Sequence, residues 1–172
     1  MNSLTKPDAQ EIAVYYAGYI ALCPESDLFS ALEGASSRFR HVLGGIPESK
    51  GGHRYADGKW SITEVVQHLI DCERIFAYRA LRFARNDGTE LHGFDENAYS
   101  PAALVDRRTL GELVAEQEAV RASTVLLFRS LTGEMLLRRG RANGNPFSVR
   151  ALGWAIAGHE RHHMDVIVQR YL

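Results

Sequence analysis

Four segments of this chain repeat apolar side chains at alternating spacings of three and four residues, and no segment alternates clearly as a strand does. The second segment shows the pattern best, with Ile62, Val65, Leu69, Cys72 and Phe76 in sequence. Such spacing places the apolar side chains on one face of an α-helix, and that face must be buried against other helices. The pattern therefore predicts an all-α fold, specifically a four-helix bundle.

Capping residues mark where these helices begin. Ser61 with Glu64, and Thr109 with Glu112, form the S/T-x-x-E capping box, in which each side chain accepts a hydrogen bond from a backbone N–H of the first turn. Ser148 is placed to cap the last helix. We expect the long helices at about residues 26–43, 61–86, 109–131 and 148–170.

The remaining segments are expected to be connections and one extension. Residues 1–24 form an N-terminal extension with a short helix to about Ala17, since Cys23-Pro24 interrupts the pattern. The segments 44–59, 87–108 and 133–146 are predicted to be loops. The second is long enough to cross over the bundle or to carry function. All 172 residues are expected to form a single domain.

Composition narrows the class of protein. The formal net charge is -1, so no strongly basic field suggests nucleic acid or an anionic membrane as a partner. No apolar run approaches the ~18 residues of a membrane-spanning helix, and the N-terminus does not resemble a secretory signal. Two cysteines, Cys23 and Cys72, do not suggest a disulfide framework. We therefore expect a cytoplasmic protein that acts on a small molecule.

Two histidines interrupt the apolar face of the last helix. That face contains Leu152, Ile156, His159, His163 and Val166 at spacings of four and three, so both imidazoles point inward. An unpartnered polar ring in this position costs roughly 1–3 kcal/mol. Two imidazoles one helical turn apart can bind a single metal ion, but a third ligand must come from elsewhere in the chain.

The candidate third ligand is His68, on the flank of the helix that begins at Ser61. Three neutral imidazoles suit Zn, Ni, Cu or Fe, and they leave at least one coordination position open. A metal with an open position can activate water or bind a substrate thiolate. Asp71 and Cys72, three and four residues after His68, are placed to reach the same site. Asp71 is interpreted as either a supporting carboxylate or a surface one, and Cys72 as a small buried residue.

Other interpretations of these residues stay open at this point. Residues 159–163 match H-E-x-x-H, the zinc-peptidase helix with its glutamate as general base. Those enzymes usually draw a third ligand from downstream, and no histidine follows His163, so a peptidase is disfavoured. Glu160 and Asp71 are weak candidates for a general base. The competing structural interpretation is a non-catalytic bundle whose metal site is closed by a fourth ligand, Asp71 or Cys72.

Two motifs resemble the DinB-like (damage-inducible, YfiT-like) superfamily, which is unrelated to the DNA polymerase of that name. Residues 58–74, GKWSITEVVQHLIDCER, resemble its second-helix signature, and residues 156–167, IAGHERHHMDVI, resemble its last-helix signature. The segments 93–95 (GFD) and 143–150 (NGNPFSVR) resemble its linking segments. The resemblance extends over roughly residues 25–172.

The resemblance implies a four-helix bundle with a long crossover connection, often a homodimer. It also implies one divalent metal ion, zinc or nickel first, with Fe, Mn and Cu as alternatives, held by His68, His159 and His163. Characterised relatives include S-transferases that use bacillithiol, mycothiol or glutathione, and a maleylpyruvate isomerase. Many other members are described only as metal-dependent hydrolases. The resemblance thus implies either a low-molecular-weight thiol transferase or a hydrolase.

Overall fold

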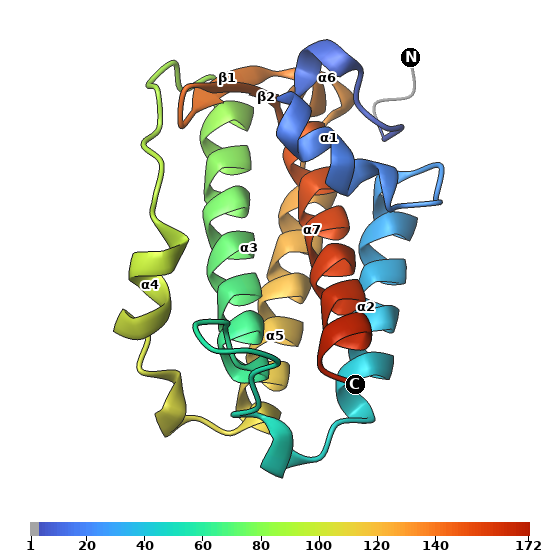
Figure 1. Cartoon of the computed structure of the whole chain (residues 1–172). Helices are drawn as coiled ribbons and strands as arrows, with labels where there is room; N and C mark the ends of the chain where they lie inside the picture. Colours follow the sequence, from blue (N-terminus) through green and yellow to red (C-terminus); the bar gives the residue numbers. More distant parts are fainter. Residues whose placement is uncertain (1–3) are drawn as a thin grey trace.

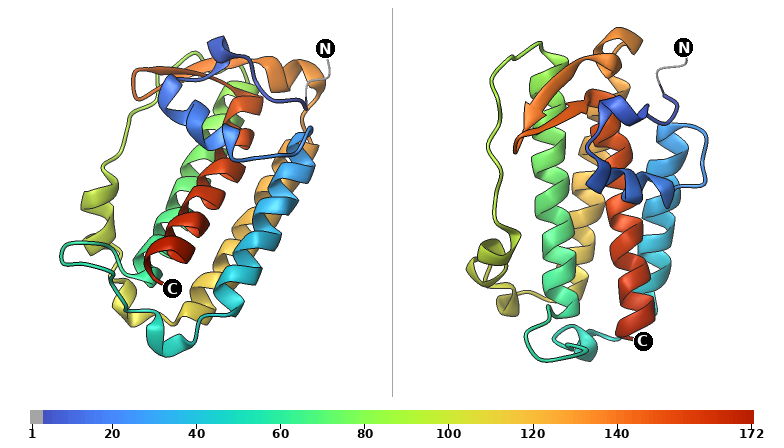
Figure 2. Two further views of the ribbon diagram at one scale, coloured as in Figure 1. Left: turned by 45° about the vertical axis from the view of Figure 1, so that its right-hand side comes forward. Right: turned by 45° about the horizontal axis from the view of Figure 1, so that its top comes forward.

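A computed structural model, which describes residues 4–172, confirms the helical bundle (Figure 1). Its four long helices are α2 (Leu28–Gly44), α3 (Ile62–Ala84), α5 (Leu110–Arg129) and α7 (Val149–Arg170). Helix α7 packs against α2 and α3, and α5 packs against α3 and α2. Helices α2 and α7 run in one direction and α3 and α5 in the other, so the neighbours α3 and α5 are parallel (Figures 1 and 2).

The parallel pair requires a connection that returns along the whole bundle. This crossover descends outside α3 and contains α4 (Glu96–Ala102) and the 3-10 turn η3 (Val105–Arg107) (Figure 1). The prediction of a loop at 87–108 was therefore partly wrong. Asp95 caps α4 by accepting hydrogen bonds from the backbone N–H groups of Asn97 and Ala98, at 2.9 and 3.3 Å. A helix of this length lacks the repeated apolar spacing that reveals longer ones.

A small hairpin covers one end of the bundle and was also missed. Strands β1 (Arg139–Ala142) and β2 (Asn145–Ser148) pair antiparallel, after the short helix α6 (Gly133–Leu137). Asn143 and Gly144 form the turn between the strands with φ of 51° and 72°. Two consecutive positive φ values are typical of the type I′ hairpin turn, for which Asn-Gly is the preferred sequence.

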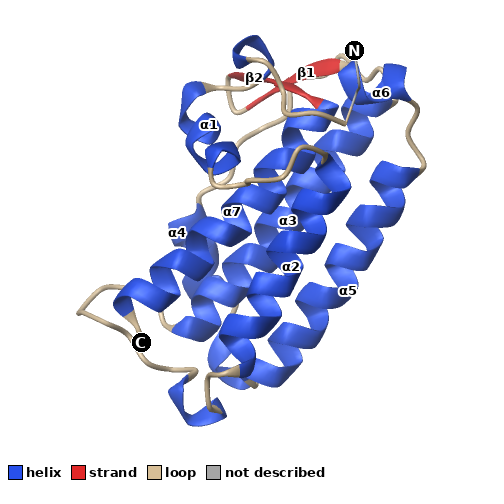
Figure 3. Ribbon diagram, turned by 90° about the vertical axis from the view of Figure 1, so that its right-hand side faces the viewer, coloured by secondary structure: helices blue, strands red, loops and turns tan. Residues whose placement is uncertain are grey.

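The N-terminal segment is divided where one short helix was expected. The 3-10 turn η1 (Ala9–Glu11) and helix α1 (Val14–Ala21) are separated by Ile12, whose extended backbone pairs with Phe147 of β2. This pairing overrides the local helical pattern. Helix α1 then lies across α7 at the hairpin end of the bundle (Figure 3). One further 3-10 turn, η2 (Glu48–Lys50), lies in the connection between α2 and α3.

The core consists of two apolar clusters with a polar layer between them. One cluster lies toward the hairpin and includes Phe83 and Trp154, and the other lies toward the opposite end and includes Phe39 and Ile62. Between the clusters, each of the four long helices contributes buried or half-buried polar side chains. No helix within residues 4–172 combines the length and apolar character needed to cross a bilayer. The polar layer contains the predicted metal ligands.

Candidate metal centre

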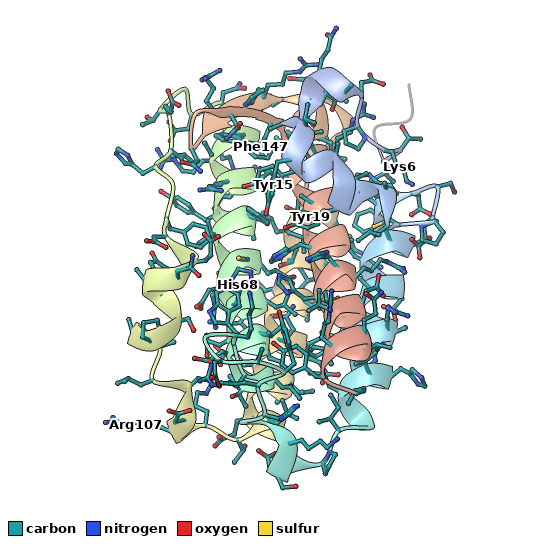
Figure 4. The ribbon with its side chains drawn as sticks, in the orientation of Figure 1. Lys6, Tyr15, Tyr19, His68, Arg107 and Phe147 are labelled. Atoms are coloured by element: carbon teal, nitrogen blue, oxygen red, sulfur yellow. The ribbon has the colours of Figure 1, made fainter. Side chains whose placement is uncertain are left out.

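The three predicted histidines meet in the polar layer. His68 comes from α3, whose first turn is fixed by the capping box: Ser61 N–H donates to Glu64 Oε2 at 2.6 Å, and Glu64 N–H donates to Ser61 Oγ at 3.2 Å. His159 and His163 come from successive turns of α7. Figure 4 shows His68 on α3, below Tyr15 and Tyr19 of α1. The packing of α3 against α7 joins ligands that are 91 residues apart in sequence.

One ring nitrogen lies within hydrogen-bonding distance of two others. The Nε2 atom of His159 is 3.1 Å from Nε2 of His68 and 3.0 Å from Nε2 of His163. One imidazole nitrogen carries either a hydrogen or a lone pair, so His159 Nε2 cannot form a well-directed hydrogen bond with both neighbours. A cation shared by the three nitrogens would accept a lone pair from each.

The spacing also fits a metal ion. Metal–nitrogen bonds of about 2.0–2.1 Å at the tetrahedral angle place ligand nitrogens about 3.3 Å apart. The observed separations of 3.0 and 3.1 Å are close to that value. The three ring centroids of His68, His159 and His163 lie 4.6 to 5.0 Å from one another. The two nitrogen–nitrogen separations measured from His159 therefore suit a divalent ion with nitrogen ligands.

Burial keeps these imidazoles neutral, which metal binding requires. Desolvation lowers the pKa of His68 to about 4. The pKa values of His159 and His163 lie well below the ordinary range, because of burial first and then repulsion among the neighbouring histidines. At neutral pH all three rings thus have a lone pair free for a ligand bond.

Cys72 offers a second way to complete the site. Its Sγ lies 3.6 Å from both ring nitrogens of His68, and the ligand atoms of His68, Cys72 and His159 all lie within 4.8 Å of one another. Burial raises the pKa of Cys72 to about 12, so its thiol is protonated unless a metal displaces the proton. The structure thus places two further donors beside His68 and His159, the imidazole of His163 and the thiol of Cys72.

The two candidate bases form hydrogen bonds with side chains other than the histidines, and neither lines the cavity described below. Glu160 is buried, with Oε1 accepting from Gln117 Nε2 at 3.1 Å and Oε2 accepting from Arg121 Nη1 at 3.0 Å. Asp71 is half-buried and accepts a hydrogen bond from Gln67 Nε2 at 3.0 Å. Burial raises the pKa of both carboxyls. Their role in catalysis stays a prediction.

A cavity of about 260 Å³ opens beside the histidines. All three histidines line it, together with Cys72 and the neighbouring ring of His162, which lies 5.0 Å from His163. Phe94 and Glu96 of the connection after α3 and Asn143 of the hairpin turn also line it. A space of this size accommodates a small molecule.

Several wall residues were not anticipated from the sequence. Six aromatic side chains face the cavity: Tyr15, Tyr16, Tyr19, Trp60, Phe76 and Phe94. Trp60 lies 4.8 Å from the ring of His68, and Tyr19 lies 5.2 Å from that of His159. Arg79 also lines the cavity, whereas the arginines of the 133–146 segment do not. The i, i+4, i+8, i+11 spacing of His68, Cys72, Phe76 and Arg79 was the available signal for one shared helical face.

Comparison with known proteins agrees with this fold. Residues 31–167 match the DinB superfamily, which accounts for most of the chain. One solved structure with a similar fold is YfiT from Bacillus subtilis, described as "a probable metal-dependent hydrolase with an unusual four-helix bundle topology". It is 18% identical, with a TM-score of 0.72 over 96% of this chain and 91% of that one, a level at which the likeness shows the fold. No curated protein gave a significant match. The chain belongs to the DinB superfamily.

Proposed function

We propose that this protein is a metal-dependent enzyme in which His68, His159 and His163 hold one divalent ion, with zinc or nickel as the first candidates. The observation that carries the proposal is the contact of His159 Nε2 with the Nε2 atoms of both other histidines. The cavity beside these rings supports a catalytic role over a purely structural one, because a substrate can reach the ion.

The open coordination position of the ion would face the cavity, where the substrate would bind. A divalent ion bound there supplies Lewis acidity, which activates either a water molecule or the thiol of a low-molecular-weight cofactor. The chain itself supplies three neutral donors and a cavity wall that includes six aromatic side chains. YfiT's description as a probable metal-dependent hydrolase favours the first reaction, and the thiol transferases of the family favour the second.

Metal analysis of protein purified without a histidine tag tests the metal proposal. We expect one equivalent of zinc or nickel per chain, either as purified or after addition of the ion. Failure to take up any divalent metal would refute the proposal. The reaction is then assigned with an electrophilic substrate assayed with and without glutathione, bacillithiol or mycothiol. A rate that depends on the thiol identifies a transferase, and product formation with water alone identifies a hydrolase.

Cys72 favours a second candidate, a non-catalytic bundle with a closed structural site. Its thiol lies close enough to His68 to act as a fourth protein ligand. Cobalt substitution separates the two, because a cysteine ligand gives an intense sulfur-to-metal absorption band that three histidines and water do not give. A homodimer, which the family resemblance implies, stays a prediction that light scattering in solution checks.

A further inference from the structure

Arg79 differs from every other buried Glu or Arg side chain in the described part of the chain. Five such side chains, Glu11, Glu73, Arg121, Arg150 and Glu160, each form a salt bridge with an oppositely charged partner. Arg79 is only 3% exposed, yet no carboxylate of residues 4–172 forms a salt bridge with it. A buried charge without a counter-charge is costly, so natural proteins rarely keep one without a use.

The guanidinium is held in place rather than mobile. Its Nη2 donates a hydrogen bond to the backbone carbonyl of His92 at 3.0 Å. The rings of Phe76 and Phe94 lie 5.8 and 6.0 Å from its central carbon, within the range of cation–π contacts. These contacts use one of the five N–H donors of the guanidinium, together with the faces of its planar group. The other donors are available for an anion.

Arg79 lies on the face of α3 that lines the histidine cavity. It is eleven residues after His68, about 16 Å further along the helix axis. Because helical side chains tilt toward the N-terminus, the long side chain of Arg79 extends back along α3 in the direction of His68. Both side chains line the same cavity, with Phe76 between them in sequence. A small molecule in that cavity would have one end near the histidines, an apolar middle against aromatic rings, and the other end near the guanidinium.

We infer that Arg79 binds the anionic group of the substrate, a carboxylate or phosphate carried by an otherwise apolar small molecule. This inference rests on the proposed function, because it takes the histidine cavity as the substrate pocket. A guanidinium matches the two oxygens of such a group with paired hydrogen bonds. Arg79 would then select and orient the substrate, and the bound anion would supply the counter-charge that the chain itself does not provide.

Binding of model compounds to zinc-loaded, tag-free protein tests this inference by calorimetry. The probes are phenylbutyrate and phenyl phosphate, with phenylbutanol as the neutral analogue. We expect the wild-type protein to bind at least one anion about tenfold or more tightly than the alcohol, as a charge-assisted hydrogen bond predicts. Arg79→Gln should remove that preference, leaving alcohol binding unchanged. Arg141→Gln, on the exposed hairpin, is the matched control and should retain it.

The zinc content of each variant and a parallel titration of chelator-treated protein separate this inference from the metal proposal. If Arg79→Gln holds zinc as wild type does but no longer prefers the anion, both proposals stand. If neither the wild-type protein nor any variant binds zinc, but the preference for the anion still depends on Arg79, only the metal proposal fails. Equal binding of anions and alcohol by wild-type protein overturns the inference, and this measurement needs no variant to fold. An anion preference that persists in Arg79→Gln also overturns it.

Discussion

At the scale of single residues, the site contains closely packed positions where a larger or displaced side chain would not fit. His159 is 7% exposed, and its Nε2 contacts both other histidine nitrogens. Gly158, the residue before it, lies against the backbone of α1. A Cβ at this position would be 2.1 Å from the carbonyl oxygen of Tyr19. The same short stretch of α7 therefore provides a predicted ligand and the contact surface for the helix that covers the pocket.

Replacement of His163 should abolish metal binding. His163→Ala leaves two imidazoles, which hold a divalent ion much more weakly than three. His53→Ala, in the connection before α3, should bind the ion as wild type does. Metal content after dialysis measures both variants, and Cys72→Ser measured alongside them identifies which side chain completes the site. Equal metal content in His163→Ala and wild type would contradict the ligand assignment.

Gly158→Ala should destabilise the protein by about 1–3 kcal/mol, the range typical of forced overpacking. The added methyl group meets backbone rather than a flexible side chain, so α1 must move away from α7. Gly111→Ala is the control, because a Cβ at that helical position meets nothing within 4 Å. That change should stabilise the protein by up to about 1 kcal/mol through helix propensity. Urea unfolding of both variants gives the comparison.

At the scale of elements, local sequence signals fixed the long helices but not the short ones. The capping boxes at Ser61 and Thr109 form as predicted, and Ser148 caps α7 by accepting a hydrogen bond from Ala151 N–H at 3.1 Å. The hairpin was missed although Asn143-Gly144 is a strong turn signal, because its strands are four residues long and lack alternation. Helix α4 was missed for the same reason of length.

Ser61→Ala should lower the stability of the protein by about 1 kcal/mol, as loss of an N-cap side chain typically does. The first turn of α3 would lose the acceptor for Glu64 N–H. Ser37→Ala, an exposed substitution within α2, should change stability little. Thermal unfolding followed by circular dichroism measures the difference. Equal midpoints for the two variants would show that the capping box contributes little here.

At the scale of the whole molecule, two buried ionic clusters join distant elements. Arg121 on α5 donates to Glu73 on α3, to Glu160 on α7 and to Ser36 on α2, and so connects all four long helices. Arg150 at the start of α7 donates to Glu11, and this pair fixes the N-terminal segment. These clusters set the relative positions of the helices that carry the histidines.

Arg121→Met should destabilise the protein by about 3–5 kcal/mol, because it leaves the carboxylates of Glu73 and Glu160 buried without a counter-charge. Arg40→Met removes an exposed pair with Glu33 and an exposed hydrogen bond to Ser37, and should cost about 0–1 kcal/mol. Urea unfolding of the two variants measures this contrast. A cost below 1 kcal/mol for Arg121→Met would mean that the cluster does not hold the bundle together.

Glu11 should make stability depend on pH in the acid range. Burial alone would raise its pKa, but hydrogen bonds from Arg150 and Ser148 outweigh burial and lower the pKa to about 2 from an ordinary value of 4.5. Its contribution is therefore complete above about pH 4.5 and is lost as the pH falls toward 2. The stability difference between wild type and Glu11→Gln should shrink over this interval in urea unfolding. A difference that does not change with pH would contradict the assignment.

The sequence by itself determined the features that depend on local periodicity. It gave the four long helices, their caps, the inward direction of His159 and His163, and, with the family resemblance, the choice of His68. The helices, their caps and the inward direction of the two histidines follow from residues within one or two turns of each other, where backbone geometry fixes which side chains share a face.

The tertiary structure decided everything that depends on neighbours far apart in sequence. It showed that Tyr19 of α1 packs against the ring of His159, that Glu160 belongs to the ionic cluster with Arg121, and that Arg79 is buried without a salt bridge to any carboxylate of residues 4–172. A salt bridge or its absence is a property of the packed molecule, because the partner can come from any element. Periodicity can place a charged side chain on an inward face, but only the fold shows what that side chain meets there.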